Sequence, residues 1–64
     1  MLTEKNIQSI ENTLNHYGSI YYHSTTETQK ENSRRVCQGI AIVLHEIGYE
    51  ITWKNEKAKI QKEM

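Results

Sequence analysis

The fold is decided within residues 36–53, VCQGIAIVLHEIGYEITW, where the spacing of the apolar side chains changes. In the first two thirds of this stretch, apolar residues recur every three or four positions, which predicts one side of a helix. From Tyr49 to Trp53 they alternate with polar residues, which predicts a strand with one buried face. Gly48 separates the two patterns. We therefore predict a helix over about 31–47 that is followed directly by a strand.

The boundary itself has a specific signature. Gly48 occupies the position of the left-handed residue that ends many helices, and Tyr49 can fold back on Leu44 as in a Schellman motif. Beyond the first strand, residues 54–57 (Lys-Asn-Glu-Lys) predict a polar turn, after which apolar and polar residues alternate again. The stretch of about 49–61 is therefore predicted to be a β-hairpin whose inward-facing residues are Tyr49, Ile51, Trp53, Ala58 and Ile60.

Residues of about 3–22 predict a first helix, with Thr3 as the N-cap. Gly18 leaves two alternatives open. It is either the C-terminal cap, followed by a short strand over 20–22, or an internal residue that costs the helix about 1 kcal/mol. The apolar side of this helix consists of Ile7, Ile10, Leu14, Tyr17 and Tyr21.

A polar turn of about 23–30 connects the two helices, since residues 23–32 include no apolar side chain. The second helix is predicted to start either at the capping box formed by Ser24 and Glu27, or later, at Asn32 or Ser33. When the two apolar sides are paired as antiparallel helices, the chain folds back near Glu27.

The predicted fold class is therefore α+β, mainly α: an antiparallel helical hairpin followed by a C-terminal two-stranded β-hairpin, in a single domain over 1–64. A chain of 64 residues forms a small core. A second copy of the chain is expected to complete it, so we predict a homo-oligomer.

Composition limits the classes of function. Eight Lys and Arg residues balance eight Glu residues, and this zero net charge disfavours a nucleic-acid binder. No apolar run is long enough to span a membrane, and the start of the chain does not resemble a secretory signal. The single cysteine, Cys37, excludes an internal disulfide, so we expect a cytoplasmic protein. The frequent Ile, Lys and Asn residues suggest a bacterial or phage coding sequence.

No set of residues predicts catalysis, a cofactor or a metal site. His16, His23, His45 and Cys37 lack the short spacings of zinc ligands. Cys37 lies on the apolar side of its helix, where packing is the expected role. We therefore expect a protein that is not an enzyme.

Two sets of residues are predicted to contact other molecules. Tyrosine, tryptophan and arginine are enriched in interfaces, which selects a partner-binding set: Tyr21, Tyr22, Arg34, Arg35 and Trp53. The second helix is apolar on more sides than one neighbour can cover, and an internal glycine permits close approach of another backbone. The predicted oligomer interface consists of Val36, Gly39, Ile42 and Val43.

The expected function is protein–protein binding by a homo-oligomer, for example as a phage or mobile-element inhibitor or adaptor of host machinery. One alternative is a nucleic-acid-binding or transcription-regulating module that uses the two arginines and the hairpin lysines. Another is a small-molecule binder at a protomer interface.

Overall fold

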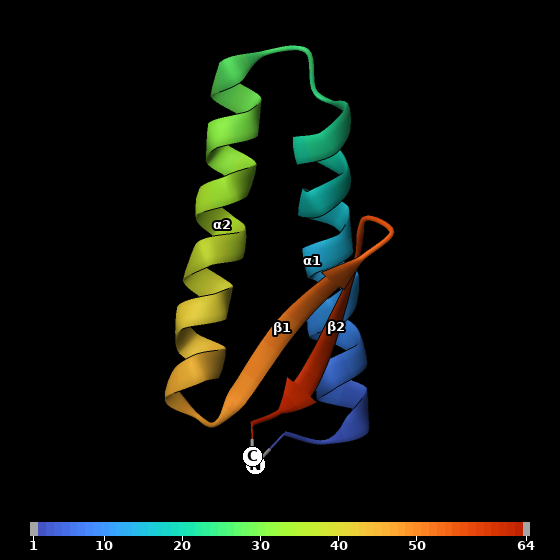
Figure 1. The fold of residues 1–64 in the computed structure, drawn as a ribbon, viewed down its shortest axis with the longest axis vertical. Coiled ribbons are helices and arrows are strands. Elements are labelled where there is room, and N and C mark those ends of the chain that lie inside the picture. Colours follow the sequence, from blue (N-terminus) through green and yellow to red (C-terminus); the bar gives the residue numbers. More distant parts are fainter. Residues whose placement is uncertain (1, 64) are drawn as a thin grey trace.

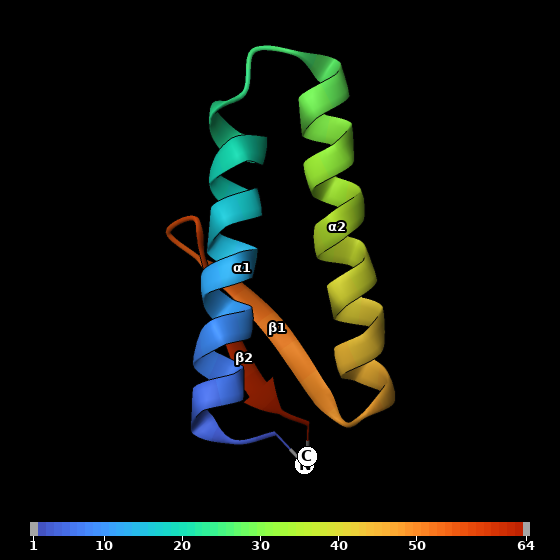
Figure 2. The ribbon, with the colours of Figure 1, turned by 180° about the vertical axis from the view of Figure 1, so that it is seen from behind.

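The computed structural model describes residues 2–63 and has two antiparallel helices followed by a two-stranded antiparallel hairpin (Figure 1). The predicted α+β, mainly α fold class is confirmed. The hairpin crosses one side of the helix pair diagonally, and the opposite side carries no further element (Figure 2). The elements are α1 (Glu4–His23), α2 (Glu27–Glu46), β1 (Tyr49–Lys54) and β2 (Lys57–Lys62).

The first helix begins as predicted. The Thr3 side chain accepts a hydrogen bond from the backbone N–H of Asn6 at 3.1 Å, and the Asn6 side chain accepts one from the Thr3 N–H at 3.2 Å. This reciprocal pair is a capping box that satisfies N–H groups left free at the start of the helix.

Gly18 lies inside α1, which settles the two alternatives in favour of a continuous helix. A Cβ atom at this position would lie 2.9 Å from the indole ring of Trp53. The ring therefore packs directly on the glycine backbone, and this contact accounts for an otherwise unfavourable residue within a helix.

The connection between the helices is shorter than predicted. Instead of a turn over 23–30, only residues 24–26 separate the helices, and α2 begins at Glu27 rather than near residue 31. Neither predicted cap is correct. Thr26 is the N-cap, and its side chain accepts a hydrogen bond from the N–H of Gln29 at 3.3 Å. The first turns of α2 are polar and form because of this cap and their own helix propensity, without burying an apolar face.

The end of α2 is confirmed. Gly48 adopts the left-handed conformation with φ of 88°, and its N–H donates to the carbonyl of His45 at 3.1 Å. Leu44 and Tyr49, which flank this turn, both belong to the buried core. The glycine thus turns the chain directly from helix into strand.

The hairpin is closed by a two-residue turn. Asn55 and Glu56 have φ values of 52° and 64°, as in a type I′ turn, whose backbone matches the twist of the paired strands. Ile51 lies opposite Ile60 and Trp53 opposite Ala58 in the resulting register.

The core is small. Its buried residues are Leu14, Leu44, Tyr49, Ala58 and Ile60. Three of the five inward-facing hairpin residues are therefore buried as predicted, whereas Ile51 is partly buried and Trp53 remains 40% exposed. Trp53 differs because it lies at the turn end of the hairpin, where its ring meets Gly18 and borders an open cavity.

Two polar side chains of α1 bind the backbone of β2. The carboxylate of Glu11 accepts a hydrogen bond from the N–H of Ile60 at 2.8 Å, and the Asn15 side-chain oxygen accepts one from the N–H of Ala58 at 2.7 Å. Two side chains four residues apart on one side of a helix thus reach two N–H groups that are two residues apart along one edge of a strand. Glu11 is itself buried, at 9% exposure, so this edge of the sheet is fixed to α1.

Replacing Glu11 tests how much this contact contributes. Glu11→Ala leaves the Ile60 N–H buried without an acceptor, and we expect the free energy of unfolding to fall by about 1–3 kcal/mol. Glu11→Gln keeps an acceptor and should lose less. Urea unfolding followed by circular dichroism measures both, with the exposed Gln8→Ala as the control. Equal stability of Glu11→Ala and Gln8→Ala would contradict the assignment.

Candidate functional site

A cavity opens between the helices beside β1, on the side that carries the sheet. This front cavity has a volume of about 330 Å³ and receives residues from both helices and from the strand. Tyr21 and Tyr22 stand edge to face there, with ring centroids 5.4 Å apart, and both are at least 39% exposed. The cavity is lined by Gly18, Tyr21, Tyr22, Arg34, Cys37, Gln38, Ala41, Ile51 and Trp53.

Arg34 adds a positive charge to the rim of the front cavity. Its guanidinium donates to Glu31 at 3.1 Å, and Arg35 donates to the same carboxylate oxygen at 3.3 Å. The hydrogen bond and positive charge of Arg34, with a smaller effect of Arg35, hold the pKa of Glu31 below its ordinary value. The same hydrogen bond raises the pKa of Arg34. One carboxylate serves two arginines, so a net positive charge remains on this part of α2.

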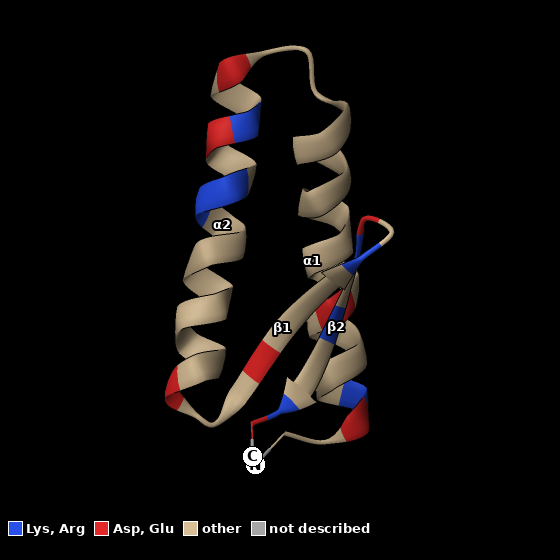
Figure 3. Cartoon of the chain, viewed as in Figure 1, with Lys and Arg blue, Asp and Glu red and all other residues tan. Residues whose placement is uncertain are grey.

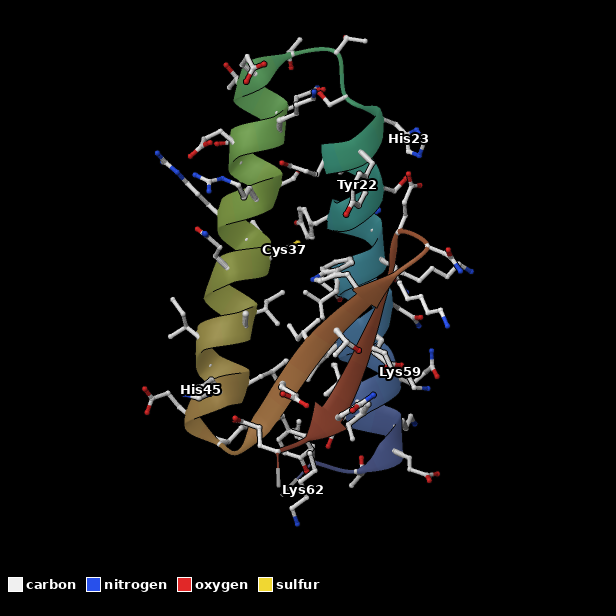
Figure 4. The ribbon with its side chains drawn as sticks, viewed as in Figure 1. Tyr22, His23, Cys37, His45, Lys59 and Lys62 are labelled. Carbon is white, nitrogen blue, oxygen red and sulfur yellow. The ribbon has the colours of Figure 1, made fainter. Side chains whose placement is uncertain are left out.

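Cys37 belongs to the front cavity and lies on the side of α2 that faces α1 (Figure 4). The thiol is partly buried, and this burial raises its pKa. A raised pKa lowers the fraction of reactive thiolate. Cys37 therefore acts as an apolar wall of the cavity at neutral pH.

A second depression lies on the opposite, uncovered side of the helix pair, the side seen in Figure 2. This rear groove has a volume of about 540 Å³. Val43 and Ile47 are 61% and 53% exposed, so large apolar side chains meet solvent here. The groove is lined by Leu2, Ser9, Ile10, Thr13, Arg35, Val36, Gly39, Ile40, Val43, Leu44 and Ile47.

Gly39 lies in the rear groove with open space above it. A Cβ atom built at this position would meet no heavy atom within 4 Å. The chain therefore provides no packing reason, among residues 2–63, for a glycine that costs its helix about 1 kcal/mol. Gly18 differs, because Trp53 occupies the space above it.

The two predicted sets of residues largely separate onto the two surfaces. Of the partner-binding set, Tyr21, Tyr22, Arg34 and Trp53 line the front cavity, while Arg35 lines the rear groove. Of the predicted oligomer interface, Val36, Gly39 and Val43 line the rear groove. Ile42 lies outside the groove on the same helix and is 64% exposed.

Sequence reasoning missed several residues of both surfaces. Gln38 and Ala41 in the front cavity, and Ser9 and Thr13 in the rear groove, are small or polar and carry no interface signal by type. Helical spacing contains the missing information, since each lies three or four positions from a residue that borders the same surface.

The basic residues of the hairpin form a third feature. Lys54 and Lys57 lie opposite each other in the register, and Lys59 shares their outward face because it lies two residues after Lys57. Figure 3 shows these basic residues on the hairpin. Lys59 and Lys62 are exposed, and Lys62 extends beyond the end of the hairpin (Figure 4). These lysines are separate from Arg34 and Arg35, so the predicted basic residues do not form one continuous patch.

The histidines lie on different parts of the surface. His23 is 3.5 Å from Glu56 in the hairpin turn, and His45 is 3.0 Å from Glu63 after β2. In residues 2–63 no three His, Cys, Asp or Glu side chains are grouped so that they could hold a metal ion.

No protein-family model, no curated protein and no solved structure matches this chain. Neither of the two helices in residues 2–63 has the length and apolar character required to cross a lipid bilayer.

The reactivity of Cys37 tests the description of the front cavity. Because burial raises the pKa of the thiol, we expect iodoacetamide to alkylate the native protein several-fold more slowly than the urea-unfolded protein at mildly alkaline pH. Mass spectrometry over time measures the two rates. A faster reaction in the native protein would show an activated thiol and contradict this assignment.

Proposed function

We propose that this protein is a non-enzymatic protein-binding module that works as a homodimer, with the rear grooves of two copies packed against each other. The observation that carries the proposal is the uncovered apolar side of the helix pair. Exposed aliphatic side chains gathered in one groove are typical of a surface that another protein covers.

The exposed area is larger than that of a compact monomer. A compact monomer of 7.5 kDa is expected to expose about 4,200 Å², whereas this chain exposes 5011 Å². The difference of about 800 Å² is consistent with the elongated shape of 36 × 19 × 17 Å, which leaves one long side of the helix pair available to a partner.

Gly39 and the charges of α2 favour a second copy of the chain as the occupant. In a two-fold pair of antiparallel α2 helices that cross at Gly39, residues equally distant from Gly39 lie at the same height. Val36 therefore lies within one residue of the height of Val43 of the other copy, and both line the rear groove. Arg35 then lies about one helical turn from Glu46 of the other copy. Figure 3 shows the charged residues of α2 on its first half and at its last residue, Glu46, with none over 36–45, so an antiparallel pair brings the charged half of each helix towards Glu46 of the other copy.

The alternatives have less support. The two arginines of the nucleic-acid hypothesis share Glu31, and the hairpin lysines lie elsewhere, so the basic residues do not form one continuous patch for a nucleic-acid backbone. A small-molecule ligand between protomers would require aromatic residues in the rear groove, and the tyrosines and Trp53 that could supply them line the front cavity. A role as an inhibitor or adaptor of host machinery, in the cytoplasm of a bacterium, stays a prediction.

The dimer is tested by measuring mass in solution. We expect size-exclusion chromatography with light scattering to give twice the monomer mass of 7.5 kDa at micromolar concentration. Val43→Lys should give the monomer mass with an unchanged helix content, because Val43 is largely exposed within one chain. Thr52→Lys, on the outward face of the sheet, is the control and should remain dimeric. A monomeric wild-type protein would overturn the proposal.

The antiparallel arrangement makes a separate prediction about charge. Arg35→Glu should raise the dimer dissociation constant several-fold, since it faces Glu46 of the other copy with a like charge. Adding Glu46→Arg in the same chain should restore the wild-type value. Sedimentation equilibrium measures all three constants. No restoration in the double variant would contradict the crossing at Gly39.

A further inference from the structure

We propose that the free edge of β1 binds an extended segment of a partner protein, which adds a strand to the sheet and places one bulky apolar side chain in the front cavity. This inference names the kind of target that the proposed protein-binding function requires, and it rests on that function. It uses a surface separate from the rear groove, so the two can be tested independently.

The two edges of the sheet differ in their hydrogen bonding. The outer edge of β2 is occupied, because its outward N–H groups at Ala58 and Ile60 donate to side chains of α1. The residues opposite them, Trp53 and Ile51, must direct their own N–H and C=O groups away from β2. Within residues 2–63, no backbone or side-chain hydrogen bond reaches this edge of β1.

Free strand edges are sites where another strand can pair, and proteins commonly block them with a proline, a bulge or a covering segment. β1 has six residues, no proline and an uninterrupted register with β2. Its edge therefore has the regular geometry that an added strand requires, and alternate side chains of that strand would point towards the helices.

The front cavity lies where such an inward side chain would point. Ile51 and Trp53 border it from β1, and both helices continue beyond the free edge of the sheet (Figure 1). An added strand would therefore lie over the second half of α1, which carries Tyr21 and Tyr22, and the first half of α2 beside it. Exposed aromatic rings around an apolar cavity are suited to a large apolar side chain.

A second copy of this chain does not fit the free edge. If two copies paired their β1 edges as antiparallel strands, the two hairpins would form one continuous sheet. The two-fold axis would be perpendicular to that sheet, so the helix pairs of both copies would lie on the same side of it. Because α1 and α2 already extend past the edge of β1 on that side, the helices of a second copy would collide with them (Figures 1 and 2). The occupant must therefore be a segment that is not covered by helices of its own.

Charge narrows the chemistry of the segment. Arg34 lines the front cavity, and its one carboxylate partner within residues 2–63, Glu31, is shared with Arg35. Lys54 ends β1 beside the turn. The expected ligand is thus an extended segment with one large apolar residue flanked by acidic residues.

The probe is a library of random dodecapeptides displayed on phage, selected on the wild-type protein. We expect the recovered peptides to share one large apolar residue with acidic neighbours. Binding of a synthetic recovered peptide should slow hydrogen exchange at the amides of Ile51 and Trp53. Failure to recover a peptide, or a bound peptide that leaves these amides unchanged, would overturn the proposal.

Variants test the cavity and the edge separately. Ala41→Phe fills the front cavity and should weaken peptide binding at least tenfold, whereas Asn12→Phe, which lies on neither surface, should not change it. A synthetic chain with an N-methyl group on Ile51 lacks the outward N–H but keeps the side chain, and should weaken binding similarly. Unchanged binding by either the filled or the N-methylated protein would contradict strand addition.

The dimer is measured in parallel. Val43→Lys should lose dimerisation and keep peptide binding. Ala41→Phe should keep dimerisation and lose peptide binding. Loss of the peptide interaction alone would reject the partner segment and leave the dimer in place. A monomeric wild-type protein that still binds peptide at the edge would reject only the dimer.

Discussion

The hydrogen bonds from Glu11 and Asn15 to the backbone of β2 determine how the rest of the molecule is arranged. A two-stranded hairpin is barely stable alone and needs a neighbour to pack against. By holding the outer edge of β2 against α1, these two side chains fix where the hairpin lies on the helix pair. They thereby fix the other edge as the free one, and they leave one whole side of the helices without a cover.

Most of the fold is present in the sequence because it depends on local signals. The change of apolar period around Gly48, and the cap at Thr3, each act within a few residues and were predicted correctly. The turn between the helices was predicted too long because polar residues allow either a loop or an exposed helix. The start of α2 depends on which hydroxyl group accepts a hydrogen bond from an N–H of the first turn, and in the structure this group belongs to Thr26 rather than Ser24.

The types of residue that form the two surfaces could be predicted from the sequence, but which of these residues lie together on each surface could not. Tyrosines, arginines and the apolar residues of α2 stood out as contact residues, yet their division between two sides of the helix pair depends on where the hairpin lies. That position is set by Glu11, which reads in the sequence as an ordinary exposed carboxylate. The packing of Trp53 on Gly18 is equally invisible, because it joins distant parts of the chain.

The same two hydrogen bonds join residues that are far apart in the sequence: the separation is 43 residues for Asn15 and Ala58, and 49 residues for Glu11 and Ile60. They therefore close a loop that contains most of the chain. Helical hairpins with local contacts form quickly, whereas contacts of high sequence separation require the entropy of loop closure to be overcome first. Among residues 2–63, two of the five buried apolar residues lie on the helices. The helix pair alone therefore has little core, and folding should be a single cooperative event whose rate is limited by docking of the last strand on the first helix.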